Sequence, residues 1–291
     1  MGSEMCIRDR YYSMMIKLSI KLEMIMKALV LESKGTPFVY KDVKDPVLNE
    51  NEAVAKIIAC GSGLTIQHVR AGRIKVDYPR IIGHEITAVI EEVGKNVTNV
   101  SVGDAVTAYF YLTCGYCKWC NNNRETLCEN FGGYVGREID GAYAEYMKLP
   151  AENFLKIPEA LDWKKNPAEI AVICDAIATP FKVIRHASIK TQDTVAIIGA
   201  GGGLGIHMIM MAKWANSTVI AVDIASDKFA ACKQVGADIC INPRDHNDNQ
   251  AFYDYTKGLG VDVVIDFVSN NESLNLGFSI LARGGRLVTL G

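Results

Sequence analysis

The chain has 291 residues, of which 49% are hydrophobic and 22% charged, and its formal net charge is −2. A chain of this length and composition can bury a sizeable core in one large or two ordinary domains. The near-neutral charge leaves no basic footprint for nucleic acid. No run approaches the roughly 18 apolar residues that a membrane span requires. We therefore expect a globular protein that binds neither nucleic acid nor membrane.

Both ends of the sequence differ from ordinary domain sequence. Residues 1–25 carry Lys17, Lys21 and Glu23 within their apolar part and have no small-residue cleavage site, which argues against a secretory signal. Met26 resembles a native initiator methionine, because the strand-like sequence "MKALVLES" begins there. We therefore interpret residues 1–25 as a non-native extension. The chain stops at the buried-strand pattern "GGRLVTLG", which indicates C-terminal truncation. Because no secretory signal is present, we expect a cytoplasmic protein.

Five short apolar runs follow Met26, and they are "KALVL", "AVAKIIA", "ITAVIEEVG", "DAVTAYF" and "GAYAEYMKL". Turn-forming Gly, Asn, Asp and Pro separate them, as is typical of successive strands. They predict an all-β barrel or sandwich over residues 26–160.

The pattern changes after Pro158, where "AEIAVICDAIATPFKVIRHA" has the spacing of a helix. Strands are then predicted at "TVAIIG", "TVIAVD", "ADICIN", "VDVVIDFV" and "RLVTLG". The helices expected among them are "IHMIMMAKWA", "DKFAACKQVG" and "NNESLNLGFSILAR". Strands that alternate with helices indicate a doubly wound parallel sheet, so we expect an α/β domain over residues 161–291.

Four of the nine cysteines share one polar loop with the spacing C-x2-C-x2-C-x7-C, and they are Cys114, Cys117, Cys120 and Cys128. A bacterial iron–sulfur run would end in C-x3-C-P, and a zinc ribbon would separate two C-x2-C pairs by a longer span. A reducing compartment disfavours disulfides. Four thiolates suit a closed, structural zinc site, whose negative charge Lys118 and Arg124 could offset. Unligated surface thiols are the alternative.

A second group of reactive side chains is scattered along the chain, and it comprises Cys60, Ser62, His84, Glu85, Cys174 and Asp175. Thiolate, imidazole and carboxylate ligands with a fourth position free would describe a catalytic zinc. From the residues alone, the histidine and the cysteines could equally have a structural role. A His after Gly is often structural, and an isolated Cys is usually a small buried hydrophobe.

A glycine-rich turn in "TVAIIGAGGGLGIH" lies between a predicted strand and a predicted helix. The strict G-x-G-x-x-G spacing fails at Leu204, but a G-x-x-G-x-x-G variant with one further glycine fits Gly199, Gly202, Gly203 and Gly205. Such a turn lets the backbone approach a pyrophosphate at the helix N-terminus. Asp223 at the end of the next strand would bond ribose hydroxyls and repel a 2′-phosphate, which favours NAD over NADP. A turn cap is its alternative role.

The strand-rich start, the G-H-E motif, the cysteine loop and the glycine-rich turn, in this order, resemble the zinc-dependent medium-chain alcohol dehydrogenases. The resemblance runs from Met26 to Gly291, and the cysteine loop with G-H-E is its most specific part. It implies a GroES-like β-barrel catalytic domain followed by a Rossmann coenzyme domain. It also implies two zinc ions per chain, one catalytic and one structural, and a homodimer or homotetramer for the full-length form.

The family pattern assigns the ligands of the catalytic zinc. Cys60 matches the first ligand, His84 the second, and Glu85 an adjacent carboxylate that can approach the metal. The third ligand is Cys in many members and Asp in others. Counting back from a nicotinamide-contacting Thr of the family favours Asp175 over Cys174.

Two coenzyme contacts are also implied by the resemblance. Thr179 matches the nicotinamide-contacting Thr, and Lys228 matches a position near the adenosine ribose. A solvated helix lysine is the alternative for Lys228.

Two positions depart from the family pattern. Gly63 stands where many members have an Asp that orients the zinc-bound His, and Thr65 stands where a His often ends the proton relay. Ser62 is retained at the position that passes the alcohol proton outward, and His68 could replace the missing His or lie on the surface. Loss of an outer partner of a metal ligand typically lowers metal affinity or activity about 10–100-fold.

The leading hypothesis is a zinc-dependent alcohol dehydrogenase in which hydride passes from an alcohol to NAD and Ser62 takes the alcohol proton. The product would be an aldehyde or a ketone. A zinc-free enzyme like the quinone reductases is one alternative. A truncated fragment that binds NAD or zinc without turnover is the other.

Overall fold

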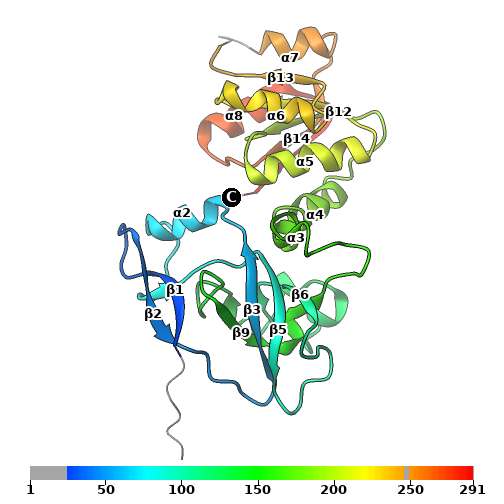
Figure 1. Cartoon of the computed structure of the whole chain (residues 1–291). Helices are drawn as coiled ribbons and strands as arrows, with labels where there is room; N and C mark the ends of the chain where they lie inside the picture. The colour runs from blue at the N-terminus through cyan, green and yellow to red at the C-terminus, as the bar shows by residue number, and fades with distance from the viewer. Residues whose placement is uncertain (1–24, 246–248, 291) are drawn as a thin grey trace, which may run out of the picture.

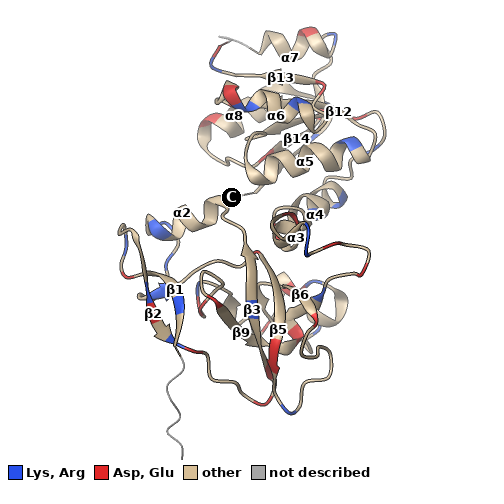
Figure 2. Ribbon diagram, in the orientation of Figure 1, with Lys and Arg blue, Asp and Glu red and all other residues tan. Residues whose placement is uncertain are grey.

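The computed structural model describes residues 25–245 and 249–290 (Figure 1). The expected extension at residues 1–25 lies outside the described residues, except for Ile25. No helix in the described part is long and apolar enough to cross a membrane. Acidic and basic residues are mixed along both halves of the molecule, as Figure 2 shows.

Antiparallel strands build the first half of the chain. A three-stranded sheet has the order β2-β1-β4 and a five-stranded sheet the order β10-β6-β5-β3-β9, while β7 and β8 form a separate two-stranded sheet. The strands are β1 (Ile25–Leu31), β2 (Phe38–Lys44), β3 (Glu52–Cys60), β4 (Arg80–Ile81), β5 (Ile86–Val93), β6 (Ala105–Ala108), β7 (Tyr111–Leu112), β8 (Gly133–Tyr134), β9 (Tyr146–Pro150) and β10 (Phe154–Lys156). The core beneath them includes Ile86, Ile90, Leu149 and Phe154.

Short helical segments interrupt this half, and the sequence patterns did not predict them. They are α2 (Leu64–Arg70), η1 (Cys120–Asn122), η2 (Glu125–Leu127) and η3 (Ala151–Asn153). α2 begins four residues after Cys60 and buries Ile66 and Val69 against the first sheet. It therefore fixes the segment that carries Ser62 and Thr65 at the start of the helix.

A five-stranded parallel sheet with the order β13-β12-β11-β14-β15 forms the second half. Its strands are β11 (Thr194–Ile198), β12 (Thr218–Val222), β13 (Ile239–Ile241), β14 (Val261–Asp266) and β15 (Leu281–Thr289). The helical segments are α5 (Gly203–Trp214), η5 (Ser226–Lys228), α6 (Phe229–Gln234), α7 (Gln250–Tyr255) and α8 (Asn271–Ile280). In order of appearance the strands are arranged 3-2-1-4-5, as in the dinucleotide-binding Rossmann sheet.

Both faces of this sheet are covered, which explains its continuous apolar strands. Val195 and Ile197 of β11 pack in one cluster with residues of α4, α5 and α6, whereas Ala196 and Ile198 pack in another with residues of α7 and α8. The predicted fold class, an all-β unit followed by a doubly wound parallel α/β unit, is confirmed.

The segment between the two halves is not the single helix that its spacing predicted. It divides into α3 (Pro167–Ala171), η4 (Val172–Cys174) and α4 (Ala178–His186). Asp175 ends η4 with φ −130° and ψ −67°, outside the helical region. α3 packs on β3 and β5 of the first half, and α4 packs on α5 of the second. The segment that contains the break at Asp175 therefore joins the two halves, and Figure 1 shows α3 and α4 between them.

Candidate active site and cysteine lobe

His84 and Asp175 form a close pair at this seam. The Nε2 atom of His84 lies 3.2 Å from Oδ2 of Asp175. Thr179, one helical turn further on, donates a hydrogen bond of 2.9 Å to Oδ1 of Asp175. Burial would raise the pKa of Asp175, but its contacts with His84 and the hydrogen bond from Thr179 together outweigh burial and lower the pKa. Nitrogen and oxygen ligands of one tetrahedral zinc are about 3.4 Å apart, so this pair fits a shared metal.

Cys174, the competing candidate for the third ligand, has a different environment. Its Sγ lies 3.6 Å from the carbonyl oxygen of His84 and 3.7 Å from that of Ala171. Burial raises the pKa of Cys174 to about 11, which leaves a neutral thiol that contacts backbone carbonyls. Its sulfur therefore faces main-chain acceptors, whereas the Asp175 carboxylate pairs with the imidazole.

Cys60, at the end of β3, stands slightly apart from the pair. Its Sγ contacts the carbonyl oxygen of Gly61 at 3.6 Å. Burial, followed by the nearby Glu85 carboxylate, raises the pKa of Cys60 to about 12. Within the described residues, Cys60, His84 and Asp175 are not grouped closely enough to count as a set of potential metal ligands, unlike the four loop cysteines. The structure thus places two of the three expected ligands together and the third nearby as a neutral thiol.

Glu85 is buried next to these groups. It accepts a hydrogen bond of 3.0 Å from the backbone N–H of Ala176. Burial first, and the Asp175 carboxylate second, raise the pKa of Glu85. A Cβ atom on Gly61 would lie 2.9 Å from the Cβ of Glu85 and closer still to its carboxylate, so only glycine fits beside this side chain.

The four cysteines of the loop form one compact group. Their sulfur atoms all lie within 4.8 Å of one another. The closest separations are 3.5 Å for Cys117–Cys120 and Cys114–Cys128, and 3.9 Å for Cys114–Cys120. A disulfide would require about 2.05 Å, whereas sulfurs bound to one tetrahedral zinc at 2.3 Å lie about 3.8 Å apart. The geometry fits a zinc ion held by four thiolates.

Backbone N–H groups, more than side-chain cations, stabilise negative charge in this lobe. Burial opposes ionisation of Cys114, but N–H donors of Tyr116 and Cys117 lower its pKa to about 6. Lys118 and Arg124, expected to offset the thiolates, instead lie over the ring of Trp119, each 5.0 Å from its centroid.

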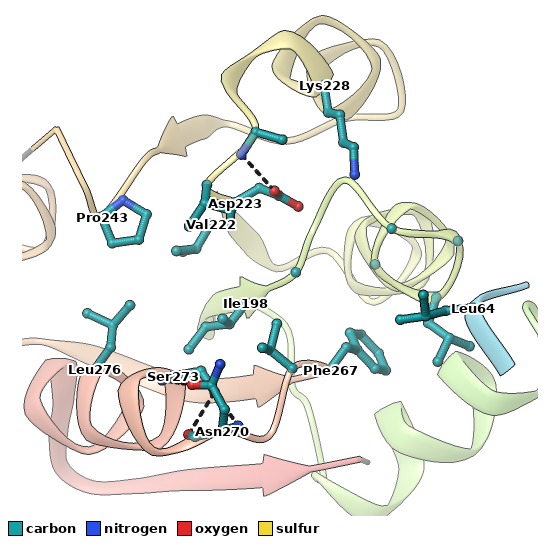
Figure 3. A pocket seen from close by; sticks show the side chains of 18 of the residues that line it. Leu64, Ile198, Val222, Asp223, Lys228, Pro243, Phe267, Asn270, Ser273 and Leu276 are labelled. Atoms are coloured by element: carbon teal, nitrogen blue, oxygen red, sulfur yellow. Dashed lines mark hydrogen bonds between the residues drawn. The ribbon is translucent and has the colours of Figure 1, made fainter. Parts of the chain in front are cut away.

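A cavity of about 1100 Å³ extends from the seam across the carboxyl end of the parallel sheet (Figure 3). From the first half and the seam it is lined by Ser62, Gly63, Leu64, Thr65, Glu85 and Asp175, among others. From the sheet side its wall includes Gly199, Gly202, Gly203, Gly205, Asp223 and Lys228. Cys60, His84, Thr179 and His68 do not line it.

At two positions of the glycine-rich turn, the backbone geometry requires glycine. Gly199 has a φ of +78°, and a Cβ on Gly205 would lie 2.3 Å from the carbonyl oxygen of Gly199. Gly205 therefore allows α5 to pack closely on β11. Gly202 caps α5 without any side-chain hydrogen bond, so the first N–H groups of the helix are open to an anion in the cavity.

Asp223 is tied to the same turn. Its carboxylate accepts hydrogen bonds from the N–H groups of Gly201 at 2.9 Å and Ala225 at 3.0 Å. Gly201 is not among the predicted coenzyme contacts, and its missing Cβ leaves room for the Lys228 side chain. The strict G-x-G spacing at Gly199 and Gly201 was the signal that could have found it. Asp223 and Lys228 face the cavity in Figure 3.

Phe110 is a second residue that the sequence analysis missed. Its ring centroid lies 4.7 Å from that of His84. No local spacing links two residues that are 26 positions apart and lie in different loops, so no sequence signal could have found this contact.

A Rossmann sheet that shares a cavity with Asp175, the partner of His84, in a chain that also carries a four-thiol lobe, defines a dinucleotide-binding oxidoreductase of two units. Comparison with known families agrees: residues 49–159 match the alcohol dehydrogenase GroES-like domain, and residues 203–291 match the zinc-binding dehydrogenase domain.

Curated relatives and solved structures extend this match over most of the chain. An alcohol dehydrogenase of Geobacillus stearothermophilus is 37% identical over 271 residues, covering 91% of this chain and 77% of the relative. An NAD-dependent alcohol dehydrogenase of Sulfurisphaera tokodaii is 33% identical, covering 91% and 78%. The cobalt- and zinc-bound thermostable alcohol dehydrogenase of Pyrobaculum aerophilum has a TM-score of 0.81 at 30% identity, covering 92% and 77%. The chain belongs to the zinc-dependent medium-chain alcohol dehydrogenase family.

Proposed function

We propose that the protein oxidises an alcohol to an aldehyde or ketone, with hydride transfer to NAD, at the seam between its two halves. The observation that carries this proposal is the shared cavity, whose wall combines Asp175 and Ser62 with the coenzyme turn. A substrate bound near Asp175 and a coenzyme bound along Gly199–Gly205 would then meet in one space.

His84 and Asp175 would hold a catalytic zinc together with Cys60. A bound zinc would supply a Lewis acid that polarises the substrate oxygen. Zinc binds the thiolate form of cysteine, so the raised pKa of Cys60 means that metal binding must displace its proton. Glu85 is the adjacent carboxylate, and Thr179 orients Asp175 through its 2.9 Å hydrogen bond.

Ser62 is the residue that would take the alcohol proton. It is exposed and lines the cavity beside Gly63 and Thr65. The Ser62 hydroxyl cannot store a proton, so it would accept the alcohol proton only while donating its own to solvent in the cavity. Thr65 offers no basic group at the position where a His often ends the relay.

Asp223 supports NAD as the coenzyme. Its buried carboxylate sits at the end of β12 and already binds the turn through Gly201. A second negative charge from a 2′-phosphate would be repelled there. The substrate is a small alcohol or carbonyl compound, and the four-cysteine lobe would hold a structural zinc.

The test is the zinc content per chain of protein purified without chelator, together with NAD-linked alcohol oxidation. Two zincs per chain with turnover support the proposal, and Cys114→Ser should then remove one zinc. A wild-type chain with a single zinc that Cys114→Ser removes would contradict the catalytic metal. It would favour a zinc-free or non-catalytic protein instead.

A further inference from the structure

The His84 imidazole has an incomplete set of hydrogen-bond partners. Its Nε2 atom lies 3.2 Å from Asp175, and no residue in the described ranges forms a hydrogen bond with its other ring nitrogen. A histidine that binds a metal ordinarily donates its second N–H to a carboxylate, a carbonyl or water, which fixes the ring and raises its basicity. Among the described residues, only ring packing remains as a protein contact that could orient this side of the imidazole.

Gly63 stands where many members of the family carry the Asp that orients the zinc-bound His. Its backbone is extended, with φ −79° and ψ 175°, a conformation that any residue adopts. A Cβ added there would have Oε2 of Glu85, at 3.9 Å, as its only neighbour within 4 Å. The chain therefore has room for a side chain at this position but supplies none to the imidazole.

Phe110 contacts the imidazole directly. The two ring centroids are 4.7 Å apart, and the planes are inclined by 40°. The backbone of Phe110 is fixed because its carbonyl accepts a hydrogen bond of 2.9 Å from Val135 N–H. Its ring is fixed by Tyr111, at a centroid distance of 4.6 Å. Phe110 does not line the coenzyme cavity. Its ring therefore packs against His84 without forming part of the cavity wall.

We propose that Phe110 is the positioning residue for His84, so that ring packing replaces the missing hydrogen bond at the metal site. This inference rests on the proposed function, since it assigns His84 to the catalytic zinc. An aromatic ring packed against the imidazole restricts its tilt. Unlike a carboxylate, it is not a strong hydrogen-bond acceptor for the second N–H. It orients the ligand without raising its basicity. The catalytic zinc should consequently be held less firmly than the zinc of the four-cysteine lobe.

The experiment measures how fast each zinc passes from the purified chain to a chelator with a colour change, and the two sites are assigned with Cys114→Ser. In Phe110→Leu one zinc should leave about tenfold faster, while the lobe zinc keeps its rate and reports that the chain is folded. Phe110→Tyr keeps the ring and should stay within about twofold of wild type. Phe131→Leu is the matched control, because Phe131 contacts Tyr111 and Tyr134 but not His84.

A second variant tests the same idea with Phe110 intact. Gly63→Asp should supply the missing acceptor and slow release of the catalytic zinc about tenfold or more, and it should restore retention in Phe110→Leu. Equal rates for Phe110→Leu and Phe131→Leu, or no effect of Gly63→Asp, would overturn the inference while leaving the proposed function intact. A wild-type chain with only the lobe zinc would overturn both.

Discussion

Asp175 and Cys174 are neighbours in the chain, yet only Asp175 contacts the imidazole of His84. The carboxylate of Asp175 lies 3.2 Å from the imidazole, while Cys174 contacts backbone carbonyls. We expect Asp175→Asn to lower kcat/KM about 100-fold or more, because it weakens a metal ligand. Cys174→Ala should lower kcat/KM by less than about fivefold. Steady-state kinetics with NAD and the zinc content of each variant distinguish the two candidate ligands. A larger loss of kcat/KM in Cys174→Ala than in Asp175→Asn would make Cys174 the ligand.

Glu85 gives a pH-dependent prediction at the same scale. Burial and Asp175 raise its pKa in the folded state, so the unfolded carboxylate, with a pKa of about 4.3, ionises first as the pH rises. The folded state therefore loses stability from about pH 4 up to the raised pKa. Glu85→Gln removes this loss in the metal-free protein, and its advantage over wild type should grow with pH across that window and then level off.

Urea unfolding of the chelated proteins between pH 4 and 7 measures this difference. Glu91→Gln is the matched control, because Glu91 is exposed on the same strand, β5. A stability difference between Glu85→Gln and wild type that stays constant with pH would contradict the assignment.

At the scale of elements, the junction between β11 and α5 depends on one glycine more than on its neighbours. A Cβ on Gly205 would lie 2.3 Å from the Gly199 carbonyl, whereas one on Gly203 meets nothing within 4 Å. Gly205→Ala should lower the free energy of unfolding by about 2 kcal/mol or more through overpacking. Gly203→Ala should leave it unchanged or raise it by up to about 1 kcal/mol. Chemical denaturation of the two variants tests this, and equal stabilities would show that the junction can relax.

Elements whose pattern is local could be predicted from the sequence. The parallel strands follow from their apolar runs, and the cysteine lobe follows from four ligands within one loop. The break at Asp175 could not be predicted, because the spacing on both sides of it is helical and the interruption depends on contacts with His84 in another unit. α2 was missed because its seven residues are too few for a periodic pattern.

The same distinction applies to the candidate site. Asp223 and the glycines of the turn belong to one strand–turn–helix unit, so spacing alone predicts their neighbourhood. The His84–Phe110 contact joins segments that meet only in the folded barrel. The exact position of Cys60 relative to the pair depends on how β3 ends, which no spacing encodes.

At the scale of the whole molecule, the two halves have separate hydrophobic cores. The clusters of the first half involve residues between Met26 and Phe154, and those of the second half residues between Val183 and Leu290. The cavity that both halves line is therefore where a ligand can couple them. A coenzyme that spans it should stabilise both units at once.

NADH at 100 times its dissociation constant should stabilise the chain by about 2.7 kcal/mol, which corresponds to a rise in Tm of about 5–10 °C for a chain of this size. NADPH at the same concentration should raise Tm far less, because the Asp223 carboxylate repels its 2′-phosphate. Asp223→Asn removes the charge but keeps one acceptor oxygen for Gly201, so it should narrow the gap between the two coenzymes. Calorimetric melting with each coenzyme measures this. Equal shifts with NADH and NADPH in the wild-type chain would show that Asp223 caps the turn without selecting the coenzyme.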